Sequence, residues 1–189
     1  MSSDYFPFET EGNSWEFESE DGASLLLLSS GEAIRGEREC FIIERNFSPE
    51  YWYRSSCELA RYEVEDYDFG GETVVLVNRW VRHLELPLVE KNSWSDTLEV
   101  VKSVLGETVE RRVVSYGKVE GIESVDVEAG RFHQCYRVRL ERLRETRVES
   151  VLLESDTTLS YEWYAPDIGL AKFHENGVTY NLVRVTIHR

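Results

Sequence analysis

The sequence contains few of the residues that build a disulfide framework or a helical fold. Three cysteines occur among 189 residues, widely spaced at Cys40, Cys57 and Cys135. An odd number of distant cysteines is not the pattern of a disulfide-stapled secreted domain, so we expect reduced thiols, with a single bridge as the alternative. Alanine, the best helix former, occurs six times against 21 valines. This ratio favours strands over helices.

Long apolar runs and an excess of basic residues are also missing. The longest apolar runs have four residues, as in the four leucines at 25–28, and are much shorter than the ~20 residues that span a bilayer. The N-terminal segment lacks the basic start and apolar stretch of a secretory signal, so we expect a cytoplasmic protein, with an exported mature chain as the alternative. With 21 basic and 36 acidic residues the net charge is −15, which disfavours nucleic acids and anionic membranes as partners.

A two-residue alternation of apolar and polar side chains recurs along the chain and predicts β-strands. Near the N-terminus, for example, Trp15 and Phe17 alternate with glutamates. A slip in the alternation at 182–183 predicts either a β-bulge or burial on both sides of the last strand. The strongest hairpin signal is Asn176-Gly177, which suits a type I′ turn. Further turns are expected at Asp21-Gly22, Gly70-Gly71, Leu105-Gly106, Tyr116-Gly117 and Ala129-Gly130.

Two charged segments, 96–106 and 139–151, fit either a helix or a strand. In the first, Asp96 and Glu99 have the spacing of a capping box, which favours a helix. Both segments also alternate, and because their neighbours have strand patterns we favour strands. The predicted fold is all-β, a curved antiparallel sheet in the form of a half-open barrel or a two-layer β-sandwich. We expect at most one or two short helices.

One sequence pattern occurs twice in the chain. Residues 5–15 and 86–94 each begin with an apolar-Pro-apolar entry and reach an Asn-Ser-Trp sequence, which ends at Trp15 in the first copy and at Trp94 in the second. Two such copies indicate two similar β halves, at about 5–84 and 85–189. We expect these halves to form one domain that spans residues 1–189.

These two segments, together with 125–136 and 163–172, resemble the TapB-like family of bacterial β-rich proteins. The family pattern reads Pro-Leu-x-x-Gly-x-x-Trp, then Val-x-Ala-Gly-x-Phe-x-x-Cys, then Tyr-Tyr-Ala-x-Gly-x-Gly-Leu-Val-Lys. The second motif matches 127–135 and the third 163–172, while Lys91, Asp167 and Ala171 depart from the pattern. The resemblance implies a curved antiparallel sheet akin to lipoprotein-carrier folds, and it carries over no catalytic residue.

Sequence motifs of known enzyme classes are missing from the chain. It contains no Gly-x-Ser-x-Gly, no glycine-rich phosphate loop and no His-Glu-x-x-His. His133 and Cys135 would point from one face of a strand, but two ligands do not make a metal site. The arginines between 137 and 147 are interleaved with glutamates, which predicts a cross-strand charge ladder rather than an anion site. We therefore expect no catalytic residue, no metal and no cofactor.

The aromatic residues of the motif segments are the candidates for a binding site, since they lie at strand entries and corners. We expect a non-enzymatic protein that binds an apolar small molecule or lipid, or an extended partner segment, on a concave sheet face. A structural or assembly module with protein contacts at Tyr51-Trp52-Tyr53 is the alternative, and a hydrolase is less favoured. The candidate ligand-binding residues are Phe6, Trp15, Trp94, Phe132, Trp163 and Tyr164.

Overall fold

The chain folds almost entirely into strands. The computed structural model describes residues 4–69 and 72–188, and the helical element in them is a 3₁₀ turn, η1 (Pro7–Glu9). No helix in this part of the chain has the length and apolar character needed to cross a membrane. The prediction of an all-β fold is confirmed, and both segments that also fitted a helix, 96–106 and 139–151, lie in strands and tight turns.

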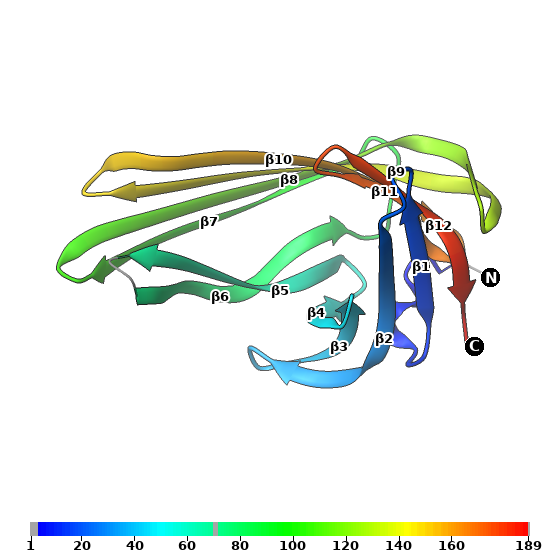
Figure 1. Cartoon of the computed structure of the whole chain (residues 1–189), viewed down its shortest axis with the longest axis horizontal. Helices are drawn as coiled ribbons and strands as arrows, with labels where there is room; N and C mark the ends of the chain where they lie inside the picture. The colour runs from blue at the N-terminus through cyan, green and yellow to red at the C-terminus, as the bar shows by residue number, and fades with distance from the viewer. Residues whose placement is uncertain (1–3, 70–71, 189) are drawn as a thin grey trace.

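Twelve described strands form one antiparallel sheet in the order β6-β5-β4-β3-β2-β1-β12-β11-β10-β9-β8-β7. Strand β1 pairs with β12, so the two ends of the chain meet in the middle of the sheet (Figure 1). The strands are β1 (Ser14–Ser19), β2 (Ser24–Arg35), β3 (Arg38–Arg45), β4 (Ser48–Arg54), β5 (Glu58–Phe69), β6 (Glu72–Glu85), β7 (Ser93–Val104), β8 (Glu107–Val127), β9 (Gly130–Val148), β10 (Val151–Ala165), β11 (Gly169–Glu175) and β12 (Val178–Thr186).

The sheet has a rounded body and a long arm (Figure 1). The arm comprises residues 62–69, 72–79, 96–115 and 142–158, from the six strands β5 to β10 and the turns that join them. Strand β4 pairs only with residues 59–61 of β5, and β11 pairs only with residues 160–165 of β10. The longer strands therefore extend beyond their short neighbours and form the arm.

The sheet curls until its two edge strands, β6 and β7, lie close together, and side chains join them. The Arg82 N–H donates to Asp96 Oδ2 at 3.3 Å, and the Trp94 indole N–H donates to the His83 carbonyl at 3.2 Å. Farther along the arm, Lys102 Nζ donates to the Val75 carbonyl at 2.8 Å. These contacts satisfy part of the hydrogen-bonding capacity that an open sheet edge exposes.

Large apolar side chains fill the body, whereas the arm has a small core of its own. In the body Trp15, Phe17, Leu59, Leu84 and Leu182 are at most 1% exposed. Near the end of the arm a separate cluster consists of Leu76, Val104, Val109 and Val148. Charged side chains fill the interior between the two apolar clusters, and the candidate site lies where the apolar interior of the body meets these charged side chains.

Several local predictions can be checked directly. Asn176 and Gly177 have φ values of 52° and 80°, as the type I′ hairpin requires, and the register shift between Glu16 and Phe17 leaves Val183 as the bulge in β12. Leu105-Gly106 is also a turn, whereas Gly70-Gly71 lies outside the described residues.

The turn predicted at Tyr116-Gly117 is wrong. Gly117 lies within β8 and pairs with Trp94 of β7. A Cβ at Gly117 would overlap the Trp94 indole. This glycine therefore provides room for a ring and does not bend the chain.

The two Asn-Ser-Trp segments make the same backbone hydrogen bonds. Gly12 and Lys91 both have positive φ, 88° and 69°. Their N–H groups donate to the carbonyls of Ser29 at 2.8 Å and Val119 at 2.9 Å, respectively. The N–H groups of Ser29 and Val119 donate back to the following asparagine carbonyls. In the second copy, Lys91 thus takes the place of Gly12 and adopts the same positive φ, a conformation that favours glycine.

Candidate functional site

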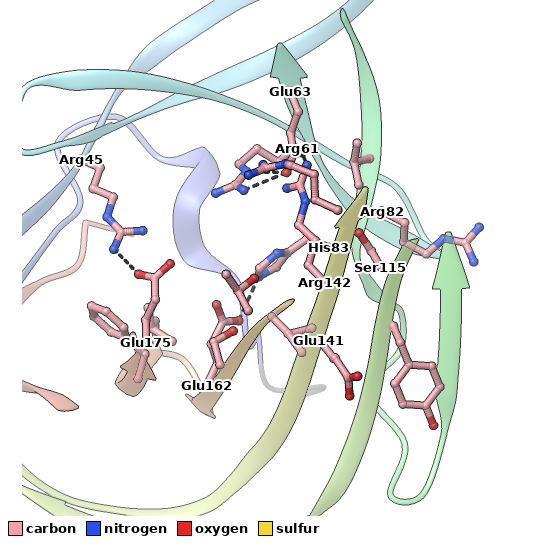
Figure 2. Close-up of a pocket in the computed structure, with 18 of the residues that line it drawn as sticks. Arg45, Arg61, Glu63, Arg82, His83, Ser115, Glu141, Arg142, Glu162 and Glu175 are labelled. Carbon is pink, nitrogen blue, oxygen red and sulfur yellow. Dashed lines mark hydrogen bonds and ion pairs between the residues drawn. The ribbon is translucent and has the colours of Figure 1, made fainter. Parts of the chain in front are cut away.

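A cavity of about 290 Å³ opens where the body meets the arm. Its wall is built from nine strands, β2, β3 and β5 to β11, so residues from both ends of the sheet face each other across it (Figure 2). One side of the wall is apolar and the other side is charged.

The apolar side comes mainly from β2 and β11. Leu25 and Leu27 alternate with outward-facing residues on β2, and Leu170 and Phe173 lie on β11. All four side chains are at most 9% exposed. The Trp94 indole also lines the cavity, where it covers the backbone of Gly117. This side offers a preformed apolar surface of the kind that small-molecule sites use.

On the charged side, His83, Glu162 and Tyr164 form a hydrogen-bonded cluster (Figure 2 shows the first two). His83 Nε2 lies 2.9 Å from Glu162 Oε2, and the Tyr164 hydroxyl donates to the same oxygen at 2.5 Å. The Trp52 ring packs edge-on against His83, with ring centroids 5.0 Å apart. These contacts hold the imidazole in one orientation.

The surroundings shift the pKa values of Glu162 and Tyr164 in opposite directions. Burial tends to raise the pKa of Glu162, but His83, the Tyr164 hydroxyl and Arg61 outweigh it, and the pKa lies below its ordinary value. Burial and the Glu162 carboxylate raise the pKa of Tyr164 well above its ordinary value. Tyr164 therefore stays protonated and serves as a hydrogen-bond donor.

A chain of ion pairs continues from this cluster into the arm. Arg61 Nη2 lies 2.8 Å from Glu63 Oε1, and Arg142 Nη2 lies 2.5 Å from Glu63 Oε2. Burial tends to raise the pKa of Glu63, but the two arginines outweigh it and the pKa is lowered. Glu65, only 6% exposed, accepts hydrogen bonds from three arginines, Arg111, Arg142 and Arg144.

Three of these arginines, Arg111, Arg142 and Arg144, have a buried Nε–H donor without a partner in the described residues. Arg142 and Arg144 lie two residues apart on β9, so they share a face of the strand, and both line the cavity. Their Nη2 groups bind Glu65, but their Nε–H groups are buried and have no hydrogen-bond acceptor in the described residues. A buried donor without an acceptor costs about 1–3 kcal/mol relative to a paired one.

The six candidate ligand-binding residues are distributed over several parts of the molecule. Trp94 lines the cavity between the body and the arm. Phe6, Trp15 and Tyr164 are packed in the body core, where the Trp15 indole donates to the Ile168 carbonyl at 2.6 Å. Trp163 belongs to a second apolar cluster with Cys135, and the partly buried Phe132 contacts both clusters. Of the six, the described cavity therefore uses Trp94.

Polar and charged side chains surround Trp163 in this second apolar cluster. Its indole N–H donates to Glu123 at 2.5 Å, and the cations of Lys172 and Arg137 lie 5.1 and 5.5 Å from the ring centroid. The neighbouring corner follows the sequence-based expectation. Strand β10 ends at Ala165 before Pro166, and Gly169 has a φ of 87°.

His133 and Cys135 do not share a face, contrary to the expectation for a regular strand. Gln134 between them has a φ of 58°, and the register of β8 and β9 shifts at this point, so His133 is exposed while Cys135 is buried. Burial raises the pKa of Cys135 to about 11, which keeps the thiol protonated. All three cysteines are free. The described residues contain no cluster of three or more potential metal ligands.

Sequence reasoning missed the charged half of the cavity. Arg137 pairs with Glu120 on the adjacent strand β8, as a charge ladder predicts, but Arg142 and Arg144 reach across the interior to β5. The signal was available in the alternation, because Glu162 has the same parity as Tyr164 on β10. An acidic residue in phase with a buried aromatic indicates a polar interior.

Tyr51, Trp52 and Tyr53 do not form a flat exposed patch. All three are partly buried. The guanidinium of Arg35 lies 4.2 Å from the Tyr51 ring centroid, and that of Arg38 lies 4.7 Å from the Tyr53 centroid. Trp52 faces the interior cluster around His83.

Comparison with known proteins gives similarity at the level of the fold. No known protein family and no curated protein matches the sequence. A solved structure does match, the crystal structure of a "putative lipoprotein" from Parabacteroides distasonis, with a TM-score of 0.55 and 16% identity over 98% of this chain and 100% of that chain. The resemblance to the TapB-like family stays a sequence-based prediction. The chain thus shares the fold of this lipoprotein-named structure.

Proposed function

We propose that this chain is a non-enzymatic binding protein whose cavity holds a small molecule with a substantial apolar part. The observation that carries the proposal is the buried apolar wall of Leu25, Leu27, Leu170 and Phe173 in an open cavity of about 290 Å³. The size is near the lower end for ligand pockets. Burial of apolar ligand surface provides the driving force.

The chemistry of the charged side supports binding rather than catalysis. His83 contacts Glu162 and Tyr164, and Tyr164 is held protonated by burial. Neither partner is an activated nucleophile of the serine or cysteine type. Glu162 and His83 therefore hold each other in a fixed orientation and present a polar surface to the cavity. The cytoplasmic location and the TapB-like relationship inferred from the sequence remain proposals beside this one.

Titration with N-phenylnaphthylamine, a neutral apolar fluorescent probe, tests the proposal. We expect saturable binding at micromolar concentration, quenching of tryptophan fluorescence through Trp94, and little change when salt is raised, because the driving force is apolar burial. In Ser160→Phe a ring enters the cavity, since Ser160 lines it, and binding should weaken at least tenfold.

Ser155→Phe is the matched control. Ser155 lies on the same strand β10, is exposed, and does not line the cavity, so this variant should bind the probe like the parent chain. Circular dichroism checks that both variants fold. Equal binding by both variants, or no saturable binding by the parent chain, would contradict the proposal.

A second candidate function, assembly with further copies of this chain, is favoured by one feature of β10. Residues 151–159 pair with β9 on one side and have no strand partner on the other side among the described residues. Val151 and Leu153 on this edge are 60% and 56% exposed. Such an edge accepts an added strand. Leu153→Lys should then abolish any concentration-dependent rise in mass seen by sedimentation; a parent chain that stays monomeric at all concentrations argues against this candidate.

A further inference from the structure

One charged side chain in the wall of the cavity has no partner. Each arginine that lines the cavity forms an ion pair with a glutamate. The glutamates of the wall also have partners: Glu63 and Glu175 in those ion pairs, Glu141 with Arg139, and Glu162 with His83. The exception is Asp156 of β10, whose carboxylate has no hydrogen bond and no ion pair in the part of the chain that the structure describes. Arg144 lies opposite Asp156 in the ladder of β9 and β10, but it reaches away to Glu65 at 3.2 Å.

The position of Asp156 makes it accessible to a ligand. The side chains that face the cavity from β10 lie two residues apart and share one face of the strand: Asp156, Thr158, Ser160 and Glu162. Asp156 and Thr158 are exposed, Ser160 is half-buried, and the Glu162 side chain is 16% exposed. Phe173 of the apolar wall pairs with Glu162. Asp156 therefore lies at the mouth of the cavity, and the apolar wall lies at the inner end of this row.

This row also indicates the shape of the ligand. From Asp156 to Glu162 the strand advances six residues, which is about 20 Å. A molecule that contacts both the Asp156 carboxylate and the apolar wall must therefore be elongated, with its polar end at the mouth.

Resting on the binding function proposed above, we infer that the ligand is a long-chain amphiphile with a cationic head group of the alkylammonium type. Its ammonium group pairs with the Asp156 carboxylate beside the Thr158 hydroxyl. Its apolar chain runs inward along β10 to Leu25, Leu27 and Phe173. An ammonium group has three N–H donors and no acceptor, so it suits a carboxylate with a neighbouring hydroxyl oxygen.

Charge favours a cationic head group over the alternatives at two scales. At the mouth, an anionic head group would meet the unpaired carboxylate, whereas Arg142 and Arg144, which could attract it, are bound to glutamates. Over the whole molecule, a net charge of −15 attracts cations and repels anions. An uncharged head group gains nothing from either effect and binds through its chain alone.

Three ligands of one chain length separate the head group from the chain: dodecylammonium, dodecanoate and dodecanol. Each competes with N-phenylnaphthylamine for the cavity of the full chain at neutral pH and low salt, below the concentration at which it forms micelles. We expect dodecylammonium to bind tighter than dodecanol by about threefold or more, as an exposed ion pair allows, and dodecanoate to bind more weakly than dodecanol. Added salt should narrow both differences, because it screens charge but does not weaken burial of the chain.

Asp156→Asn removes the charge and keeps the shape of the side chain. It should lower the affinity for dodecylammonium by about threefold or more and leave the affinity for dodecanol unchanged. Glu20→Gln is the matched control, since it changes the net charge by the same amount, and Glu20 is exposed in the turn between β1 and β2 and does not line the cavity. This control should change neither affinity. Circular dichroism checks that both variants fold.

The outcomes distinguish the two proposals. The head-group inference is overturned, while the cavity function stands, if dodecanoate or dodecanol binds as tightly as dodecylammonium. The same holds if Asp156→Asn leaves the affinity for dodecylammonium unchanged, weakens dodecanol equally, or acts no differently from Glu20→Gln. If the probe and all three ligands fail to bind, the proposed function itself fails.

Discussion

Gly117 and Trp94 show how a single residue shapes the cavity. Gly117 lies in the middle of β8, where its missing side chain lets the Trp94 indole pack flat on the strand. The indole in turn donates to the His83 carbonyl on β6 and lines the cavity. One glycine therefore allows a contact that both joins the edge strands and forms part of the binding wall.

Gly117→Ala should destabilise the fold. A Cβ there would lie 2.6 Å from the Trp94 Nε1, so the ring must move and its hydrogen bond to His83 must lengthen. Overpacking of this kind costs about 1–3 kcal/mol. Urea unfolding followed by tryptophan fluorescence measures the change.

Gly121→Ala provides the comparison for this variant. Gly121 lies on the same strand, and the nearest atom to an added Cβ is Glu90 Oε1 at 3.8 Å, an ordinary contact. We expect its unfolding midpoint to stay within error of the parent chain. An equally stable Gly117→Ala would show that the indole is free to move.

The lowered pKa of Glu162 gives folding a pH dependence. Because the carboxyl has a lower pKa in the folded than in the unfolded chain, its ionised form stabilises the fold at neutral pH. That contribution is present above the unfolded value of about 4.3 and is lost as the pH falls through the folded value.

Glu162→Gln tests this linkage without changing the shape of the side chain. The parent chain should be more stable than the variant at pH 7, and the difference should shrink as the pH falls below about 4, because protonation removes the same charge that the substitution removes. Urea unfolding at a series of pH values measures both. A difference that stays constant down to pH 3 would contradict the assigned role of the His83–Glu162 contact.

At the scale of elements, the contact between β6 and β7 decides whether the sheet closes. Asp96 of β7 accepts from the Arg82 N–H and pairs with Arg79 at 3.1 Å, so one carboxylate binds two positions on β6. Two strands that lack a continuous backbone ladder depend on such side-chain contacts.

Asp96→Ala should lower the free energy of unfolding by about 1–3 kcal/mol, because it leaves a backbone donor and a partly buried guanidinium without their acceptor. Glu99→Ala on the same strand is the control. Its ion pair with Arg112 is more than half exposed on both sides and should contribute less than about 1 kcal/mol. Equal effects of the two substitutions would mean that the closure does not depend on Asp96.

At the scale of the whole molecule, the body and the arm differ in what holds them together. The body has a large aromatic and aliphatic core, whereas the arm combines a small aliphatic cluster with a charged interior. Local stability follows the density of buried apolar contacts. The arm should therefore open more readily than the body.

Hydrogen exchange measured by mass spectrometry tests this difference. Amides of β1 and β12 in the body should exchange more slowly than those of residues 142–148 in the arm, although both regions are paired on both sides. Uniform exchange across the two regions would show that the arm and the body unfold as one cooperative unit.

The sequence by itself determined the elements. The alternation over 96–106 and 135–140, the Asn176-Gly177 turn and the phase slip at Val183 all depend on neighbouring residues along the chain, and each favoured the element that the structure has. The left-handed φ at Gly169 is local in the same sense. Tyr116-Gly117 was mistaken for a turn because the ring that needs the glycine belongs to another strand.

Only the tertiary structure decided which side chains meet inside. A bulge or a one-residue register shift moves side chains to the other face of a sheet, as between His133 and Cys135, so alternation alone does not assign the inner face. The curl of the sheet then brings β5 opposite β9, strands that do not pair, and joins Glu63 and Glu65 to Arg142. The cavity arises from this closure, because contacts between distant strands have no signature in local sequence.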